Sequence, residues 1–226
     1  MATPSSASHA QRVVRGLYAI TPDQIDTAVL VARVSQALAG GIALLQYRNK
    51  AAGLRLRREQ ACAILPLCRE AGVPLIINDD LALAVEIDAS GVHLGADDGD
   101  LAAAREALGP RRLLGASCYN RAGLARSAKK AGADYVAFGS IFPSSTKPGA
   151  LRAQLEMLSA LRKELGLPIV AIGGITHDNA ARVFAAGADA VAVISDLFDA
   201  PDMAERIHQF TAIFEANKPL AADAPA

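Results

Sequence analysis

The sequence predicts an α/β protein, a single (β/α)8 TIM barrel with a parallel eight-stranded core. Short apolar segments alternate with amphipathic helical patterns, which implies parallel strands joined by right-handed crossovers. A glycine recurs where a helical pattern ends and an apolar segment follows, because glycine adopts the left-handed conformation that ends many helices. Residues 131–140 match residues 186–195 at seven of ten positions, so one unit of the fold is reused.

The sequence contains an opening strand and seven further strands that each follow such a glycine, which gives eight strands. Eight strands favour closure into a barrel over an open sheet. The seven glycines are Gly41, Gly72, Gly91, Gly109, Gly132, Gly166 and Gly187. The predicted strands cover residues 16–21, 43–48, 74–79, 91–95, 113–118, 135–140, 169–173 and 190–195.

Helical patterns fill the intervals between these strands, with apolar residues recurring at spacings of three and four. The clearest patterns cover residues 25–38, 54–71, 122–131, 151–165, 179–186 and 203–214. The alternative architecture is an open doubly wound sheet. Its G-x-G-x-x-G fingerprint after the first strand is absent, so the barrel is favoured.

The length of 226 residues fits one barrel domain, which we place at residues 13–216. Small polar residues at 1–12 and an Ala/Pro-rich segment at 217–226 predict flexible tails. Lys plus Arg and Asp plus Glu each number 23, which excludes a basic field for nucleic acid or an anionic membrane. Three cysteines without paired-ligand spacing, and no apolar run near the ~18 residues of a membrane span, indicate a reduced, cytoplasmic protein.

Two neighbouring loops late in the chain predict a phosphate site. Gly173-Gly174 lies at the end of the strand at 169–173 and precedes helix-start residues Thr176, Asp178 and Asn179. Ile194-Ser195 ends the last strand. Unpaired backbone N–H groups at a helix start favour a phosphate. A (β/α)8 barrel characteristically holds a phosphate on its last two strand loops.

Three polar side chains lie at the end of the second strand and just after it. Gln46, Arg48 and Lys50 alternate along the chain and therefore share one face. Two cations and an amide at a barrel mouth are favourable where an anion meets them, so we predict an anion-binding role. The alternative is a surface turn with solvated charges.

Carboxylates follow the third and fourth strands, at Asp79-Asp80 and Asp97-Asp98. Sites with few oxygen ligands suit Mg²⁺, which completes its coordination with water and substrate phosphates. The alternative for the third strand is that Asp80 caps the following helix, as Asp100 can after the fourth. The sequence alone leaves open which of Asp79, Asp80, Asp97 and Asp98 touch a metal directly.

Strand five ends with Ser117, and strand six is followed by a loop rich in hydroxyl groups with one lysine, Lys147. Hydroxyls and an ammonium suit phosphate oxygens, and Pro143 and Pro148 stiffen the loop, which argues against a plain linker. His93 is predicted to be a hydrogen-bonded interior residue rather than a base. Cys118 has no partner placed to activate it, so a thiol nucleophile is not expected.

One set of motifs runs in order along the chain: Gln46-x-Arg48-x-Lys50, Asn78-Asp79, Gly95-x-x-Asp98, Ser117, Pro143-Ser144-x-Thr146-Lys147-Pro148, Ile172-Gly173-Gly174-Ile175 and Val193-Ile194-Ser195. In order and spacing this set resembles the thiamine-phosphate synthase family. The resemblance extends from Leu17 to about Phe214. It implies joining of hydroxymethylpyrimidine diphosphate to a thiazole phosphate with Mg²⁺, giving thiamine phosphate and pyrophosphate.

The resemblance also implies a role for each matching residue. The pyrimidine diphosphate would be held by Gln46, Arg48, Lys50, Asn78, Ser117 and Lys147, and Mg²⁺ by Asp79 and Asp98. The thiazole phosphate would contact Ser144, Ser145, Thr146, Gly174, Ile194 and Ser195. Arg48, Lys50, Ser117 and Lys147 are the residues expected to act in catalysis. Two positions depart from the family pattern: Asn49, where an acidic residue is frequent, and Ser144, where a threonine is common.

Two other functions remain open at this point. A thiazole-phosphate isomerase of the same fold would keep the phosphate loops but would not need Arg48, Lys50 and the carboxylates. A non-catalytic regulator that binds a phosphorylated ligand is also compatible with the fold, because fold alone does not determine function. The expected partners are small-molecule substrates rather than nucleic acid or membrane. The oligomeric state, including a homo-oligomer, is not determined by the sequence.

Overall fold

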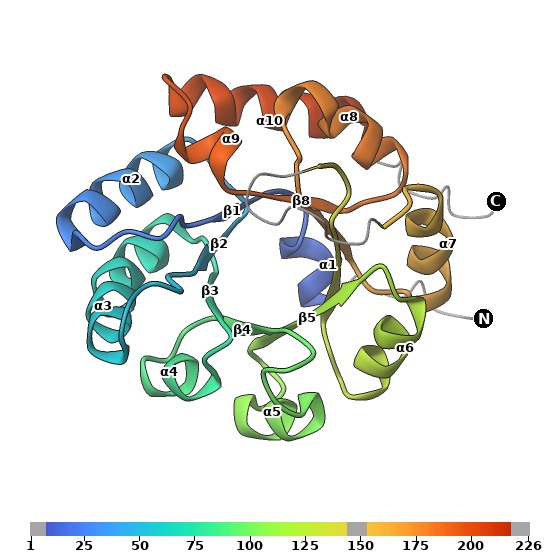
Figure 1. Cartoon of the computed structure of the whole chain (residues 1–226), viewed down its shortest axis with the longest axis horizontal. Coiled ribbons are helices and arrows are strands. Elements are labelled where there is room, and N and C mark those ends of the chain that lie inside the picture. The colour runs from blue at the N-terminus through green and yellow to red at the C-terminus, as the bar shows by residue number, and fades with distance from the viewer. Residues whose placement is uncertain (1–7, 144–152, 218–226) are drawn as a thin grey trace, which may run out of the picture.

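The computed structural model describes residues 8–143 and 153–217. Eight strands pair in sequential order, all in parallel, and close into a barrel surrounded by helices (Figure 1). The predicted fold is therefore confirmed. The strands are β1 Gly16–Ile20, β2 Leu44–Tyr47, β3 Leu75–Asn78, β4 Gly91–Leu94, β5 Leu113–Tyr119, β6 Tyr135–Phe138, β7 Ile169–Ile172 and β8 Ala190–Val193.

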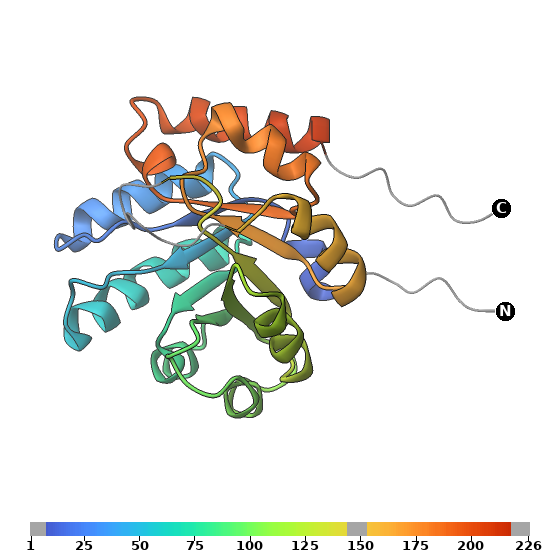
Figure 2. The same cartoon turned by 45° about the vertical axis from the view of Figure 1, so that its right-hand side comes forward.

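Helices occupy the intervals between the strands, and Figure 2 shows α8 and α10 side by side along one flank of the barrel. The outer helices are α2 Thr27–Ala39, α3 Leu54–Ala71, α4 Leu81–Glu86, α5 Leu101–Leu108, α6 Ala122–Lys130, α7 Glu156–Leu165, α8 His177–Ala185, α9 Ser195–Phe198 and α10 Met203–Asn217. Each of the six helical patterns in the sequence corresponds to one of them.

Helix α7 begins at Glu156, later than the predicted start at residue 151. Residues 151 and 152 lie outside the described residues, but Ala153 and Gln154 are not helical. Ala153 is buried, and its amide donates to the Ser140 carbonyl at 3.1 Å. This bond ties the segment to the end of β6 and keeps it out of the helix.

A short helix, α1 His9–Val13, lies in the segment that the sequence predicts as a tail. Ser8 caps it, accepting from the Gln11 amide at 3.2 Å, and the Gln11 side chain donates to the Gly166 carbonyl at 3.1 Å. Ala10 is buried with the side chains inside the barrel. The tail expectation is therefore wrong for the last residues of 1–12, because an apolar face of α1 covers the N-terminal end of the barrel.

Strand side chains pack in two layers. Alternate residues such as Leu45 and Tyr47 face the surrounding helices, and their neighbours Leu44 and Gln46 face the barrel interior. Both faces of a parallel strand are buried in this architecture, which explains the nearly continuous apolar strands of the sequence. The interior layer also includes Tyr18, whose side chain is 1% exposed.

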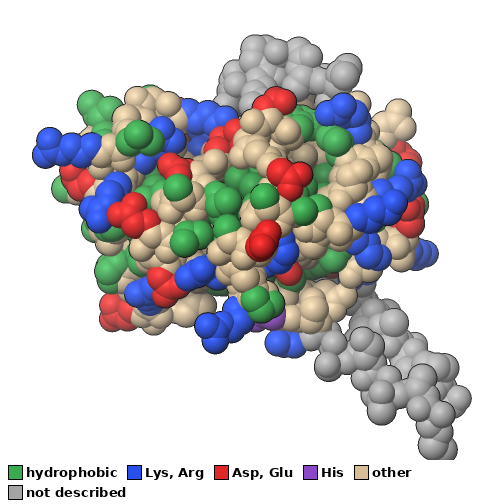
Figure 3. Space-filling view, turned by 90° about the horizontal axis from the view of Figure 1, so that it is seen from below, with side chains coloured by type: hydrophobic (Ala, Val, Ile, Leu, Met, Phe, Trp, Pro, Cys, Tyr) green, Lys and Arg blue, Asp and Glu red, His purple; other side chains and the backbone are tan. Residues whose placement is uncertain are grey.

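The surface carries charges of both signs. Figure 3 shows one face of the molecule, on which acidic and basic side chains are interspersed rather than gathered by sign. This distribution agrees with the balanced composition of 23 basic and 23 acidic residues. Among the helices of residues 8–143 and 153–217, none has the length and apolar character needed to cross a membrane.

The barrel interior has no room for a side chain at Gly115. A Cβ atom there would lie 2.1 Å from the Tyr135 ring and 2.5 Å from His93 Nδ1. We expect Gly115→Ala to lower the free energy of unfolding by about 1–3 kcal/mol, as overpacked core substitutions do.

The matched control is Gly123→Ala on α6, where a Cβ atom meets nothing within 4 Å. Alanine there is expected to raise the free energy of unfolding by up to about 1 kcal/mol, because it favours the helix. Urea unfolding of both variants measures the difference. Equal stability of the two variants would contradict the interior packing described above.

Candidate active site

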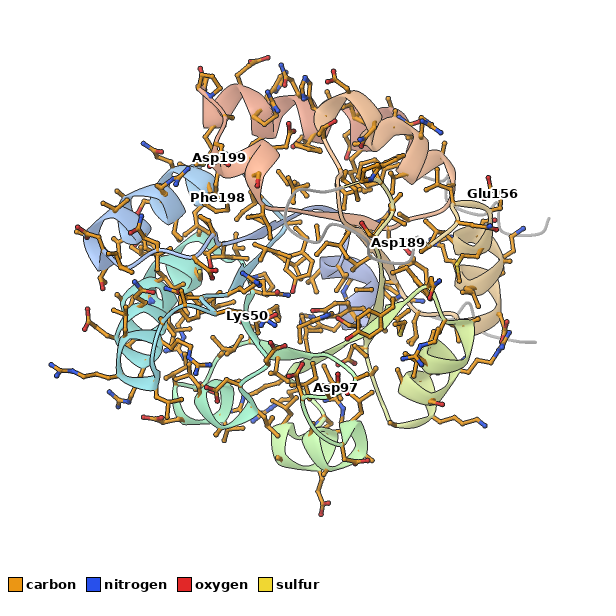
Figure 4. The ribbon with its side chains drawn as sticks, viewed as in Figure 1. Lys50, Asp97, Glu156, Asp189, Phe198 and Asp199 are labelled. Atoms are coloured by element: carbon orange, nitrogen blue, oxygen red, sulfur yellow. The ribbon has the colours of Figure 1, made fainter. Side chains whose placement is uncertain are left out.

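The residues predicted to bind an anion after β2 lie at the C-terminal end of the barrel. Gln46 faces the interior, where its side-chain amide donates to the Tyr18 hydroxyl at 2.9 Å. Beyond the strand, Arg48 pairs with Asp23 at 3.2 Å, and the Lys50 ammonium lies 3.2 Å from Asp79. Figure 4 shows Lys50 on the inner side of the ring of helices.

The loop that carries these cations is held by the loop after β1. The Thr21 hydroxyl donates to the Arg48 carbonyl and accepts from the Arg48 amide, both at 2.9 Å. The Asp23 carboxylate accepts from the Lys50 amide at 2.8 Å. Sequence reasoning missed Thr21 and Asp23, although both follow a strand end on the same rim and so carry the signal that was used for the other loops.

Asn49, one of the two departures from the family pattern, points away from the barrel mouth. Its side chain is 4% exposed and donates to the Gln24 carbonyl at 2.6 Å and to Gln60 Oε1 at 2.9 Å. Gln60 lies on α3 and also donates to the Gln24 carbonyl. Asn49 therefore supports the loop from behind and leaves Arg48 and Lys50 to face a ligand.

Two carboxylates meet beside Lys50. Asp79 follows β3 with a φ of 61°, and its amide donates to the His93 carbonyl at 2.9 Å. Asp98 accepts from the Gly95 amide at 2.8 Å and lies beside the Asp79 carboxylate. Partial burial and the neighbouring Asp79 raise the pKa of Asp98, while the Gly95 amide and Lys50 act in the opposite direction.

The structure separates these two carboxylates from the other acidic residues nearby. Asp80 accepts from the Leu83 amide and caps α4, and Asp100 accepts from the Ala103 amide and caps α5. Asp97 and Asp98 are both exposed on the loop after β4, and it is Asp98 that lies beside Asp79. The described residues contain no group of three or more His, Cys, Asp or Glu side chains placed to hold a metal. A cation at Asp79 and Asp98 would have two protein carboxylates, a donor set that suits Mg²⁺ completed by water and phosphate.

Two more predicted residues line the interior near the mouth. Ser117 on β5 is hydrogen-bonded to His93 Nε2 at 2.9 Å. The Asn78 side chain at the end of β3 has no hydrogen-bond partner among residues 8–143 and 153–217, which leaves its amide available to a ligand. The interior position predicted for His93 is confirmed, and burial lowers its pKa to about 4, so the ring is neutral at pH 7.

Cys118 does not have the character of a nucleophile. It is buried on the helix side of β5, and its thiol makes one weak contact with the Ala116 carbonyl at 3.7 Å. Burial raises the pKa of this thiol to about 12, so the thiolate is scarce at neutral pH.

The loops after β7 and β8 come together, as predicted, but two amides at the start of α8 already have partners. Thr176 N–H donates to Asn179 Oδ1 and His177 N–H donates to Asp196, both at 3.0 Å. The amides of Gly174 and Ser195 have no partner in the part of the chain that the structure describes. These two amides, unlike those of Thr176 and His177, are available to a phosphate.

Gly174 is constrained by the loop after β6. Its φ is 64°, and a Cβ atom there would lie 2.3 Å from the Pro143 carbonyl oxygen. Only glycine fits this close approach with a positive φ. Four predicted residues that follow Pro143 lie outside the described residues: Ser144, Ser145, Thr146 and Lys147.

A hollow of about 600 Å³ lies at the opposite end of the barrel, beside the N-terminal ends of β3, β4 and β5. Its charged lining residues include Arg69, Asp88 and Arg112, and both arginines pair with Asp88. Because catalytic groups in this architecture lie at the C-terminal strand ends, we place the candidate site at the other face.

Similarity to known proteins identifies the family of this chain. A family model described as thiamine monophosphate synthase matches residues 17–197. The chain belongs to this family. A thiamine-phosphate synthase from Aromatoleum aromaticum is 59% identical over 203 residues, covering 90% of this chain and 98% of the relative. Another from Methylobacillus flagellatus is 58% identical over 206 residues, covering 91% and 98%.

A solved structure supports the same conclusion. Thiamine phosphate pyrophosphorylase from Pyrococcus furiosus superposes with a TM-score of 0.81 at 35% identity, covering 91% of this chain and 98% of that one. Family and fold therefore agree over the whole barrel. The resemblance noted in the sequence is confirmed, while the individual site residues stay predictions.

The proximity of the Asp79 and Asp98 carboxylates is expected to lower the stability of the metal-free protein. Asp98→Asn keeps an oxygen that can accept from Gly95 and removes the repulsion with Asp79. We expect its melting temperature in metal-free buffer to rise by roughly 2 °C, which corresponds to less than about 1 kcal/mol. Differential scanning fluorimetry with and without Mg²⁺ measures the melting temperatures. Mg²⁺ should stabilise the parent but not Asp98→Asn.

The control for this variant is Asp97→Asn, which removes the same charge from the neighbouring exposed position. Its melting temperature should stay within about 1 °C of the parent, and its response to Mg²⁺ should be retained. A fall in the melting temperature of Asp98→Asn without metal would mean that the two carboxylates do not repel each other.

Proposed function

We propose that the chain is a thiamine-phosphate synthase. It joins 4-amino-2-methyl-5-hydroxymethylpyrimidine diphosphate to 4-methyl-5-(2-phosphoethyl)thiazole and releases pyrophosphate. The observation that carries the proposal is the cluster of Arg48, Lys50, Asp79 and Asp98 at the barrel mouth, with Lys50 3.2 Å from Asp79. Such a cluster suits a diphosphate with its metal, which an isomerase or a simple phosphate-binding regulator would not need.

In this proposal the pyrimidine substrate lies on the β2 to β5 side of the mouth. Arg48, Lys50, Asn78 and Lys147 bind the diphosphate. The pyrimidine ring is held from the interior by Gln46 and Ser117. The free amide of Asn78 and the braced loop of Arg48 and Lys50 support this arrangement, because preorganised donors bind without further ordering.

Asp79 and Asp98 are the residues that would hold Mg²⁺. Two adjacent carboxylates, with the pKa of Asp98 raised, are stabilised by a cation between them. When bound, Mg²⁺ supplies charge neutralisation for the departing diphosphate. The nearby Lys50 and Arg48 side chains contribute positive charge of their own at the same place.

The thiazole phosphate occupies the opposite side of the mouth, near β7 and β8. The unpartnered amides of Gly174 and Ser195 support a phosphate there, together with the Ile194 backbone. Ser144, Ser145 and Thr146 are proposed to complete this subsite.

The chemistry requires help for a leaving group more than it requires a base. Diphosphate leaves a benzylic-type carbon, and the electron-rich aminopyrimidine ring stabilises the cation that forms. Arg48, Lys50 and Lys147 neutralise the charge that grows on the departing oxygen, a contribution that often dominates catalysis. The neutral thiazole nitrogen then attacks, and this step needs no general base. The neutral, buried His93 and the protonated Cys118 agree with that requirement.

The cellular setting follows from chemistry already described. Small-molecule substrates are the proposed partners, because basic and acidic residues are equal in number and their side chains are interspersed on the face that Figure 3 shows. Cys62, Cys68 and Cys118 are free thiols, which supports a reducing, cytoplasmic location.

The first experiment mixes the purified chain with both substrates, with and without Mg²⁺, and measures thiamine phosphate by chromatography. We expect product with the metal and a loss of at least about hundredfold after chelation, because the diphosphate departs unneutralised. A folded chain that binds thiazole phosphate yet forms no product would favour the isomerase or the regulator.

Asp79→Ala tests the separation of the two subsites. It should lower Mg²⁺-dependent turnover by at least about hundredfold and change the Kd for thiazole phosphate by less than about twofold, because the phosphate lies on other loops. Turnover assays and isothermal titration calorimetry give the two values. Asp97→Ala is the matched control and should retain turnover. Equal losses of turnover and thiazole-phosphate binding in Asp79→Ala would count against the assignment.

A further inference from the structure

A continuous chain of hydrogen bonds crosses the barrel interior and joins two of the proposed substrate-binding residues. Gln46 Nε2 donates to the Tyr18 hydroxyl at 2.9 Å, and the Tyr18 and Tyr135 hydroxyls are 2.9 Å apart. The Tyr135 hydroxyl lies 3.1 Å from His93 Nδ1, and His93 Nε2 lies 2.9 Å from Ser117 Oγ. Five side chains from five different strands are thus linked in one row.

The middle of this row is sealed from solvent. Tyr18 is 1% exposed, Tyr135 is fully buried and His93 is 7% exposed. The Tyr135 ring stacks on His93 with a centroid distance of 5.5 Å and meets Tyr18 edge to face at 6.1 Å. Gly115 leaves the space into which Tyr135 and His93 fit. Within residues 8–143 and 153–217, none of the three side chains makes a hydrogen bond outside this row, so each must satisfy its polar groups within it.

The donor at one end determines the direction of every other bond. The Gln46 amide nitrogen only donates, so the Tyr18 oxygen accepts from it, and the Tyr18 proton is left for Tyr135. If Tyr135 donated to Tyr18 instead, the Tyr18 proton would be buried without an acceptor, which is unfavourable by about 1–3 kcal/mol. Tyr135 therefore donates to His93 Nδ1.

The same logic continues through the histidine. A neutral imidazole that accepts at Nδ1 carries its proton at Nε2 and donates to Ser117 Oγ. The Ser117 hydroxyl proton is then free to donate toward the mouth. At the other end Gln46 Oε1 has no partner among the described residues and remains an acceptor. The row thus presents one acceptor, at Gln46, and one donor, at Ser117.

We infer that Tyr18, Tyr135 and His93 are positioning residues that set this donor and acceptor pattern, and that the pattern selects an aminopyrimidine over an oxopyrimidine. The inference rests on the proposed function for the ring that is bound. An aminopyrimidine offers an N–H donor next to a ring-nitrogen acceptor, which complements Gln46 and Ser117. In the 4-oxo analogue the carbonyl accepts and the ring nitrogen carries a proton, so both roles are reversed.

The test uses Tyr135→Phe, which cuts the row and frees Gln46 and Ser117 to reorient independently. Equilibrium Kd values are measured with Mg²⁺ and without thiazole phosphate, for the 4-amino diphosphate and for its 4-oxo analogue. The parent should prefer the amino compound by roughly 10–100-fold, the ratio that one mismatched buried hydrogen bond produces. In Tyr135→Phe the preference should fall below about fivefold.

Tyr47→Phe is the matched control. It also removes a buried tyrosine hydroxyl, one that donates to Gln60 at 2.9 Å on the helix side of the barrel. This control should keep the preference of the parent, because a loss of stability alone weakens both ligands equally. Tyr18→Phe cuts the same row one bond earlier and replaces Tyr135→Phe if the latter does not fold.

Two results would overturn the inference: a parent without preference, or a preference unchanged in folded Tyr135→Phe or Tyr18→Phe. Failure of the proposed function is distinguishable, because it appears as absence of thiamine phosphate from the parent. A parent that makes thiamine phosphate while Tyr135→Phe retains full discrimination would remove only the role of the row.

Discussion

The pairing of the first strand with the last is the constraint on which the rest of the molecule depends. Leu17 pairs with Val191 and Tyr18 with Ala192, which closes the sheet and leaves no free edge. Closure puts the C-terminal ends of all eight strands on one ring, so loops from both ends of the sequence share one mouth. It also encloses an interior that must be filled by whatever side chains alternate inward.

The interior is filled in two different ways along the barrel axis. Near the N-terminal end it is apolar and is covered by α1, whose Ala10 packs with the inward strand residues. Toward the mouth it becomes polar, with Gln46, His93 and Ser117 hydrogen-bonded in place. The apolar half provides stability, and the polar half supplies groups already fixed in position. Because these polar side chains are already fixed, they lose little conformational freedom when a ligand binds.

Much of the fold was predictable because its signals are local. The spacing of apolar residues, the glycines between helices and strands, and the repeat at residues 131–140 and 186–195 each depend on a few adjacent residues. The meeting of Lys50 and Asp79 was predictable as well, since parallel strands bring their ends to one rim. Sequence could not separate Asp79 from Asp80, because one residue of register decides whether a carboxylate faces the mouth or caps a helix. The bracing by Thr21 and the row through Tyr135 join residues far apart in the chain, and no short pattern encodes such contacts.

The ion pair between Lys50 and Asp79 has a consequence for how charged ligands would bind at the proposed site. Asp79, Asp98 and Lys50 together carry one surplus negative charge, and the Arg48–Asp23 pair beside them adds no net charge. A divalent cation at the proposed metal site would reverse the sign of this cluster. Lys50 stays beside the carboxylates, since its backbone amide is held by Asp23. A cation and a diphosphate would therefore each strengthen the binding of the other, because each offsets charge that the other brings.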